Sequence, residues 1–256
     1  MTDTLDLPLT PPPGGEVLYQ SDRCTLIWGD CTDPAVIASV PNHYGLLCTD
    51  PPYGVNFRSN IGRNFDLLAG DDGSVDWAVV LGSWARRLAT HRHVYVFGYT
   101  PAELTEPLQL GPTAELVWDK LMTGMGDLSQ PWGPGHERLV FGVSSANPAH
   151  GGTARKGMLA ARMRQGSVLR VPRKNATAVT RHPTEKPVAL MSQLIESSSV
   201  RGDLVVDPCA GSGSTLVAAI LEGRRAFGVE IDRKYAELAV TRIKAAEKIA
   251  AAIEAA

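Results

Sequence analysis

Short apolar runs alternate with longer helical patterns along most of this chain, and that alternation limits the possible folds more than any other feature. Seven runs are short and mostly continuous in apolar residues, as expected of strands buried on both faces. These runs cover residues 24–28, 45–49, 93–98, 115–118, 138–143, 203–207 and 225–230. Helical patterns lie among them over residues 77–88, 188–197, 214–221 and 235–256. We therefore expect an α/β fold with a mostly parallel seven-stranded sheet and helices on both faces.

Two segments do not follow this alternation. Residues 1–15 are rich in proline and end in Gly14-Gly15, a composition typical of a disordered, solvated tail. Residues 144–181 have few large apolar side chains and no clear period, which indicates an insertion on the core. The predicted organisation is a tail (1–15), a first part of the core (16–143), the insertion (144–181) and a second part of the core (182–256).

Charge is distributed unevenly. The net charge of −2 argues, taken alone, against a nucleic-acid partner. Between Gly151 and Arg181, however, there are eight basic residues and no acidic one, whereas the remainder of the chain has 17 basic and 27 acidic residues. This segment is either a solvated surface or a contact with a polyanion. Its basic residues are Arg155, Lys156, Arg162, Arg164, Arg170, Arg173, Lys174 and Arg181.

Cysteine usage and hydropathy exclude several classes of protein. Cys24, Cys31, Cys48 and Cys209 form no Cys-x-x-Cys pair and have no His-rich neighbour at metal-binding spacing. We therefore predict no metal site and no disulfide framework, and we expect a reducing environment. No apolar run is long enough to span a membrane. The expected location is the cytoplasm.

The most specific motif is Asp50-Pro51-Pro52-Tyr53, directly after the predicted strand 45–49. This is the carboxyl end of a strand, where open α/β sheets place their ligands. The prolines stiffen the backbone and leave carbonyl oxygens free to accept hydrogen bonds. With the Asp50 carboxylate they form a pair of acceptors suited to an amino group, and Tyr53 offers a flat surface for a ring. The alternative is a strand-ending turn with an exposed aspartate.

A second motif runs from Asp207 to Thr215 and joins a strand end, a glycine loop and a helix start. Such a loop lets backbone approach a ligand, and the helix N-terminus favours an anionic group. As a dinucleotide fingerprint it fails, because Leu216 stands where a third glycine or an alanine belongs. Glu230, at the end of the next strand, is placed to bind both hydroxyls of a ribose. A solvated helix cap is the alternative role for Glu230.

The third motif is Arg181-His182-Pro183-Thr184-Glu185-Lys186-Pro187, ahead of the predicted helix 188–197. A helix-start signal would account for Thr184 and Pro187. It leaves His182, Pro183 and Lys186 unexplained.

Together the three motifs resemble those of the S-adenosylmethionine-dependent amino-methyltransferases of DNA, in the beta arrangement of that family. The resemblance covers roughly residues 22–245. It implies a Rossmann-like methyltransferase sheet in which residues 144–181 form a small target-recognition insertion. It also implies that Asp50 and the Pro51 carbonyl accept from the amine of a flipped base on which Tyr53 stacks. Pro52 completes the catalytic motif.

The resemblance also implies the surroundings of the cofactor S-adenosylmethionine. Glu230 would hold the ribose, Asp30 would lie near the adenine, and Thr184 and Lys186 would close the pocket. Cys209 stands where a phenylalanine is usual, which removes an aromatic surface beside the cofactor. The implied cofactor-binding residues are Asp30, Cys31, Asp50, Thr184, Lys186, Asp207, Pro208, Cys209, Gly211, Ser212, Gly213, Ser214, Thr215, Glu230 and Ile231.

Double-stranded DNA is the implied partner. Residues 54–76 are typical of a lid, or equally of a solvated crossover loop, with Arg58 and Arg63 available for phosphates. In the basic segment, arginines can release condensed counterions and read guanine edges. The predicted DNA contacts are Arg58, Arg63, Arg155, Lys156, Arg162, Arg164, Arg170, Arg173 and Lys174.

The expected activity is methylation of the N6 amine of adenine in DNA. N4 methylation of cytosine stays open, because both reactions use the same acceptor pair, and the aspartate that begins the motif mildly favours adenine by resemblance. A non-enzymatic nucleic-acid-binding module would leave both motifs without a purpose, and a nicotinamide-dependent oxidoreductase would not explain Pro51-Pro52-Tyr53. The beta arrangement also implies a possible homodimer.

Overall fold

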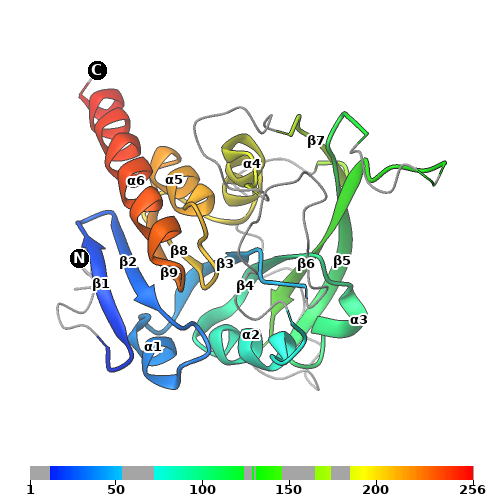
Figure 1. Ribbon diagram of the computed structural model, residues 1–256, viewed down its shortest axis with the longest axis horizontal. Coiled ribbons are helices and arrows are strands. Elements are labelled where there is room, and N and C mark those ends of the chain that lie inside the picture. The colour runs from blue at the N-terminus through cyan, green and yellow to red at the C-terminus, as the bar shows by residue number, and fades with distance from the viewer. Residues whose placement is uncertain are drawn as a thin grey trace.

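A single sheet of nine strands runs through the computed structural model, in the order β1-β2-β9-β8-β3-β4-β6-β5-β7 (Figure 1). The structure describes residues 12–53, 72–123, 129, 131–145, 165–173 and 185–255. The strands are β1 (Gly15–Gln20), β2 (Cys24–Gly29), β3 (Tyr44–Thr49), β4 (Leu88–Phe97), β5 (Leu110–Asp119), β6 (His136–Ser144), β7 (Val168–Arg170), β8 (Leu204–Asp207) and β9 (Arg225–Glu230). The helices are α1 (Pro34–Ser39), α2 (Trp77–Ala85), α3 (Pro101–Leu104), α4 (Val188–Ser198), α5 (Ser214–Leu221) and α6 (Arg233–Glu254).

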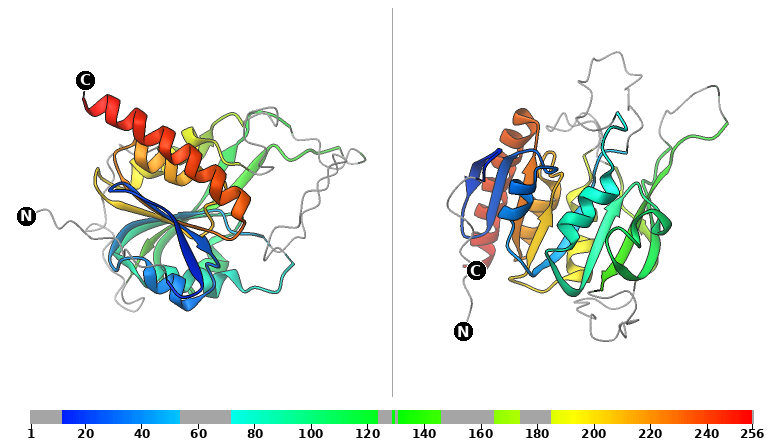
Figure 2. Two further views of the ribbon diagram at one scale, coloured as in Figure 1. Left: turned by 60° about the vertical axis from the view of Figure 1, so that its left-hand side comes forward. Right: turned by 90° about the horizontal axis from the view of Figure 1, so that it is seen from below.

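Helices cover both faces of the sheet, with α1 and α2 on one side and α4, α5 and α6 on the other (Figure 2). Successive strand residues point to opposite faces, so a strand that is apolar throughout supplies both layers. In β3, Leu46 and Cys48 join the core under α4–α6, whereas Leu47 joins the core under α1–α3. The continuous apolar runs in the sequence are thus explained by two hydrophobic cores that share one sheet.

Strand directions decide which residues meet at each edge of the sheet. The central strands β2, β9, β8, β3 and β4 are parallel. Strand β6 runs antiparallel to both β4 and β5, which makes β5 and its parallel partner β7 run with the central strands. The carboxyl ends of seven strands therefore lie at one edge of the sheet, together with the beginning of β6.

The predicted α/β sheet is confirmed. All seven predicted strands are present, and five of the eight pairings are parallel. Two further strands, β1 and β7, extend the sheet at its two edges. The helix predicted over residues 77–88 is shorter: α2 ends at Ala85 and is capped by Asp76, whose carboxylate accepts from Val79 N at 3.2 Å.

The predicted tail and insertion are described only in part. Residues 1–11 of the tail lie outside the described residues, and Gly15 already belongs to β1. In the insertion, residues 165–173 are described, and they include β7 against β5. The predicted lid is described only from residue 72 onward. No helix in these described ranges is both long and apolar enough to cross a membrane.

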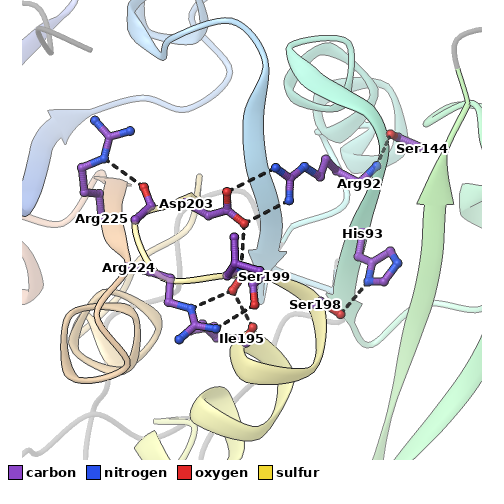
Figure 3. A network of polar contacts seen from close by, with 11 residues as sticks. Arg92, His93, Ser144, Ile195, Ser198, Ser199, Asp203, Arg224 and Arg225 are labelled. Carbon is purple, nitrogen blue, oxygen red and sulfur yellow. Dashed lines mark hydrogen bonds and ion pairs between the residues drawn. The ribbon is translucent and has the colours of Figure 1, made fainter. Parts of the chain in front are cut away.

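A buried polar network connects the strands near the opposite edge of the sheet (Figure 3). The guanidinium of Arg224 donates to the hydroxyl of Ser199 at 3.0 Å and to its carbonyl at 2.7 Å. Arg92 pairs with Asp203 at 3.0 Å. These bonds tie the end of α4 to the beginning of β9 and tie β4 to the beginning of β8, and so hold the frame on which the loops of the other edge are built.

Replacing Arg224 with methionine is expected to lower the free energy of unfolding by about 2–4 kcal/mol, because buried acceptors lose their donor. Urea denaturation measures this effect. Arg225→Met is the matched control, since the neighbouring arginine is less buried and its side chain makes one longer bond, to Gly202 O at 3.3 Å. Equal losses in the two variants would contradict a special role for Arg224.

Candidate functional site

Four acidic residues from separate strand ends gather at the edge of the sheet where the parallel strands terminate. Asp30 follows β2, Asp50 follows β3, Asp207 ends β8 and Glu230 ends β9. They come from distant parts of the sequence, and only the order β2-β9-β8-β3 makes their strands neighbours. This edge holds all three of the motifs that the sequence singles out, as far as the chain is described there.

The carboxylate of Asp50 has a protein donor on each oxygen. Tyr53 donates its hydroxyl to Oδ1, and the ammonium of Lys186 contacts Oδ2. Burial raises the pKa of Asp50 and outweighs the opposite effect of Lys186. Burial and the neighbouring carboxylate also raise the pKa of Tyr53, so its hydroxyl stays protonated and acts as the donor. Predicted catalytic residues Asp50 and Tyr53 are thus in direct contact.

Lys186 belongs to a chain of four charges. Its Nζ lies 3.2 Å from Oε2 of Glu137, and Oε1 of Glu137 accepts an ion pair from Lys120 at 2.7 Å. Burial alone would lower the pKa of Lys186, but the carboxylates of Asp50 and Glu137 raise it above its ordinary value. Burial likewise opposes ionisation of Glu137, yet the two lysines bring its pKa below the ordinary value. Positive and negative groups therefore alternate from Lys120 through Glu137 and Lys186 to Asp50.

Tyr53 lies across the end of β4. Gly98 has φ +81°, and a side chain there would collide with the ring of Tyr53. The next residue, Tyr99, donates its hydroxyl to the carbonyl of Pro52 at 3.3 Å. Gly98 and Tyr99 thus shape and hold the Pro52-Tyr53 segment from the neighbouring strand. Tyr53 remains 39% exposed, as a surface for a ring requires.

The glycine loop is anchored by Asp207. Oδ1 of Asp207 accepts from the Thr49 hydroxyl at 2.7 Å and from Cys209 N at 3.1 Å. Gly213, at φ +82°, precedes α5, and a Cβ there would lie 2.9 Å from Cβ of Ala239. Glycine therefore lets the beginning of α5 approach α6. These contacts join the loop to both β3 and α6.

Glu230 accepts hydrogen bonds from backbone on both oxygens. Gly211 N donates to Oε2 at 2.7 Å and Asp232 N donates to Oε1 at 2.8 Å. A carboxylate has about four lone-pair positions, so it can accept further donors. Burial raises the pKa of Glu230 to about 7, although the two amides oppose that shift. The side chain thus connects the glycine loop to the end of β9.

The free energy of unfolding is expected to fall with rising pH, because Asp207 and Glu230 are buried acids. Burial raises the pKa of Asp207 to about 6, from an ordinary value of 3.8. A folded-state pKa above the unfolded one contributes stability that is present below about pH 4 and lost as pH rises through about 6, roughly 3 kcal/mol for Asp207. Glu230 acts in the same direction between 4.5 and about 7.

Urea denaturation at pH 5 and pH 8 tests this expectation. The free energy of unfolding should decrease between the two values, and it should decrease less in Asp207→Asn. The control variant is Asp22→Asn, at an exposed position. It should keep the pH dependence of the parent protein. A variant without Asp207 that kept the full pH dependence would rule out this carboxylate as its source.

A cavity of about 340 Å³ opens beside Asp30. Trp28, Asp30 and Ile231 are among its lining residues, together with Glu16 and the glycines at the start of β1. The indole of Trp28 donates to the Ile231 carbonyl at 2.9 Å and lies 4.5 Å from the guanidinium of Arg233. Two predicted cofactor residues, Asp30 and Ile231, therefore face one hollow at the end of β2.

Cys31 and Cys209 meet with their sulfurs 3.9 Å apart. The contact with Cys31 and, after it, burial raise the pKa of Cys209, which keeps its thiol protonated. Both positions were expected to lie near the cofactor. The contact brings the loop after β2 against the loop after β8.

Other predicted residues are distributed as follows. The side chain of Arg242 on α6 donates to Ser212 O at 2.6 Å and to Glu185 Oε1 at 3.0 Å, which ties predicted cofactor residues to the third motif. Arg170 and Arg173 lie beside the end of β5, where Arg173 N donates to Lys120 O at 3.3 Å. The predicted residues outside the described part are Arg58, Arg63, Arg155, Lys156, Arg162, Arg164, Lys174 and Thr184.

Sequence reasoning missed several residues at this edge. Glu137 precedes the predicted strand 138–143, a position that favours a structural role, and Lys120, Tyr99 and Arg242 belong to none of the three motifs. The available signal was that β5 and β6 are consecutive and antiparallel. An antiparallel strand begins at the edge where its parallel neighbours end, so its first residues belong to that edge. Among the described residues, no group of three or more His, Cys, Asp and Glu is placed to hold a metal ion.

Comparison with known proteins gives consistent matches. A family model described as DNA methylase matches residues 109–241. The chain is 28% identical to the DNA adenine methyltransferase YhdJ of Escherichia coli K12, over 91% of this chain and 87% of that protein. It is 30% identical to the putative methylase YubD of the same organism, over 87% and 91%. The cytosine-N4-specific PvuII DNA methyltransferase shares the fold, with a TM-score of 0.67 and 14% identity over 93% and 94% of the two chains.

Proposed function

This chain belongs to the DNA methylase family, and we propose that it transfers a methyl group from S-adenosylmethionine to the exocyclic N6 amine of adenine in DNA. The observation that carries the proposal is the position of Asp50. Its carboxylate lies at the end of β3, beside the glycine loop of the neighbouring strand β8, and already accepts from two donors. It is thus a strong acceptor beside a loop suited to a cofactor.

The residues around the glycine loop fit S-adenosylmethionine. Glu230 is a buried acceptor with lone pairs left for ribose hydroxyls. The cavity lined by Asp30 and Ile231 has room for an adenine ring, and the N-terminus of α5 at Ser214 favours a carboxylate. When bound, this cofactor supplies an electrophilic methyl group to the target amine.

The residues of the chain prepare the amine for that reaction. The lone pair of an exocyclic amine is delocalised into its ring, which makes the nitrogen a poor nucleophile. Asp50 and the Pro51 carbonyl accept its two N–H groups, favour a pyramidal nitrogen and aim the lone pair. The ring of Tyr53 stacks on the base once it has left the duplex. Asp50 also lies where it can take the proton that the nitrogen loses.

Adenine is the proposed target for two reasons. The motif begins with aspartate, and a relative that matches most of the chain is named a DNA adenine methyltransferase. Methylation of cytosine at N4 is the second candidate, because a protein with that specificity has the same fold. DNA labelled with a radioactive methyl donor and digested to nucleosides decides between them. Label in N6-methyladenine supports the proposal, label in N4-methylcytosine selects the alternative, and no label in either base refutes both.

We propose that Arg170 and Arg173 contact the DNA backbone. Arg170 is 74% exposed and lies opposite Asp119 at the end of β5, on the edge that holds Asp50. The double variant Arg170→Ala/Arg173→Ala is expected to weaken DNA binding and to reduce the slope of log K against log salt by about 2. Arg201→Ala/Arg225→Ala, at the opposite edge, is the control. An unchanged slope in the first variant excludes these two contacts.

A further inference from the structure

Both acceptor oxygens of Asp50 are occupied by donors of the protein itself. The Tyr53 hydroxyl bonds to Oδ1, and the ammonium of Lys186 contacts Oδ2. An incoming amine brings its own N–H groups and competes with these donors. Each oxygen keeps a second lone-pair position for the amine, but the contact with Lys186 competes for the same carboxylate and weakens it as an acceptor.

The two donors differ in where they can go. Tyr53 is 39% exposed, and its hydroxyl can turn to water. The side chain of Lys186 is only 6% exposed, so moving its charge without a new acceptor would be costly. Oε2 of Glu137 lies 3.2 Å from its Nζ, is buried, and accepts no well-aligned hydrogen bond. That oxygen is an acceptor that Lys186 can reach by a small movement.

We infer that Glu137 is a positioning residue, which draws the ammonium of Lys186 away from Asp50 when the target amine binds. The inference rests on the proposed function, because it takes the incoming donor to be the exocyclic amine of a DNA base. No covalent bond changes in this exchange: Lys186 gives up its contact with Oδ2 of Asp50 and gains a hydrogen bond to Oε2 of Glu137.

Neighbouring residues hold the carboxylate of Glu137 in place. It lies at the beginning of β6, in register with Trp118 of β5, and Lys120 holds its other oxygen at 2.7 Å. Lys120 in turn lies 5.5 Å from the centre of the Trp118 ring. Lys186 lies 5.0 Å from the centre of the Phe97 ring, which favours a cation in that place. The carboxylate that would receive Lys186 is therefore held in place independently of Asp50.

Removing one negative and one positive charge near Asp50 should shift its pKa in opposite directions. A purely structural role would not produce these opposite shifts. The groups acting on Asp50 are Tyr53, Lys186, Glu137 and Asp207, and Lys120 acts beside Glu137. Loss of the negative charge in Glu137→Gln should lower the pKa of Asp50, and loss of the positive charge in Lys120→Gln should raise it. The acid limb of kcat/KM should therefore move to lower pH in the first variant and to higher pH in the second.

The experiment compares the full-length protein with Glu137→Gln, Glu137→Asp and Lys120→Gln. With a DNA substrate, kcat/KM of Glu137→Gln should fall roughly 10- to 100-fold, as is typical when a group behind a functional residue is removed. Glu137→Asp should recover part of the loss. The Kd for S-adenosylmethionine, measured by calorimetry, should stay within about threefold in all variants, and a carboxyl carbon NMR titration of the cofactor-free protein should show the opposite shifts of Asp50 directly.

Glu115→Gln is the matched control, because Glu115 is an exposed glutamate on the adjacent strand β5. It should retain both the rate and the acid limb. Wild-type kcat/KM in Glu137→Gln, or acid limbs that do not move in opposite directions, would overturn the inference. If Glu137→Gln does not fold, the titration of Lys120→Gln decides by the direction of its shift. Failure of the wild-type protein to label DNA would instead refute the proposed function.

Discussion

Asp50→Ala is expected to lower the rate of methyl transfer roughly 10³-fold, while the Kd for S-adenosylmethionine changes little. Asp50 supplies the charged acceptor for the target amine, and alanine supplies none. Its contacts are to Tyr53 and Lys186, whereas the backbone amide bonds of the glycine loop are made to Asp207 and Glu230. Single-turnover labelling of DNA measures the rate, and calorimetry measures cofactor binding.

Two further variants make this result specific. Asp50→Asn keeps one carbonyl acceptor without the charge, so its rate should lie between those of the parent and Asp50→Ala. Asp119→Ala removes an aspartate that ends β5 at the same edge but pairs with Arg170. That variant should keep nearly normal transfer. Near-normal turnover in Asp50→Ala would refute the proposed mechanism.

Glu230→Ala is expected to weaken binding of S-adenosylmethionine about 100-fold. Two hydrogen bonds from ribose hydroxyls to a carboxylate contribute about 3 kcal/mol together, which corresponds to that ratio. The variant also loses the bond from Gly211 N, so the glycine loop is held less firmly. KM for the cofactor should rise, and kcat at saturating cofactor should stay within a few-fold of the parent value, because Asp50 is untouched.

Glu237→Ala is the control for this variant. Glu237 lies on α6 shortly after Glu230 in the sequence, but it is 61% exposed and pairs only with Arg233 among the interactions described. Its removal should leave the Kd unchanged. An unaltered Kd in Glu230→Ala would show that this carboxylate does not hold the cofactor, and the alternative role of a helix cap would then stand.

The fold was largely predictable because its signal is local. A strand buried on both faces must be apolar throughout, so runs such as 203–207 and 225–230 can be read without knowing their neighbours. The edge strands β1 and β7 were not predicted. β1 has no fully buried residue and β7 has only three residues, so neither shows the continuous apolar pattern.

Strand direction explains the main gap in the predicted site. Asp50, Asp207 and Glu230 follow strands of a parallel set, so their shared edge follows from the alternation of strands and helices. Glu137 lies at the beginning of its strand. In a parallel sheet it would lie at the far edge, and only the antiparallel pairing of β6 with β4 and β5 brings it to Lys186.

The sequence by itself determined the α/β class, the three motifs and the acceptor chemistry of Asp50-Pro51-Pro52-Tyr53, because each depends on residues that are adjacent or regularly spaced. The tertiary structure alone decided that Lys186 contacts Asp50, that Glu137 and Lys120 stand behind it, and that Arg242 of α6 holds the glycine loop. These contacts join residues far apart in the chain. Their distances depend on strand order and direction, which local patterns do not specify.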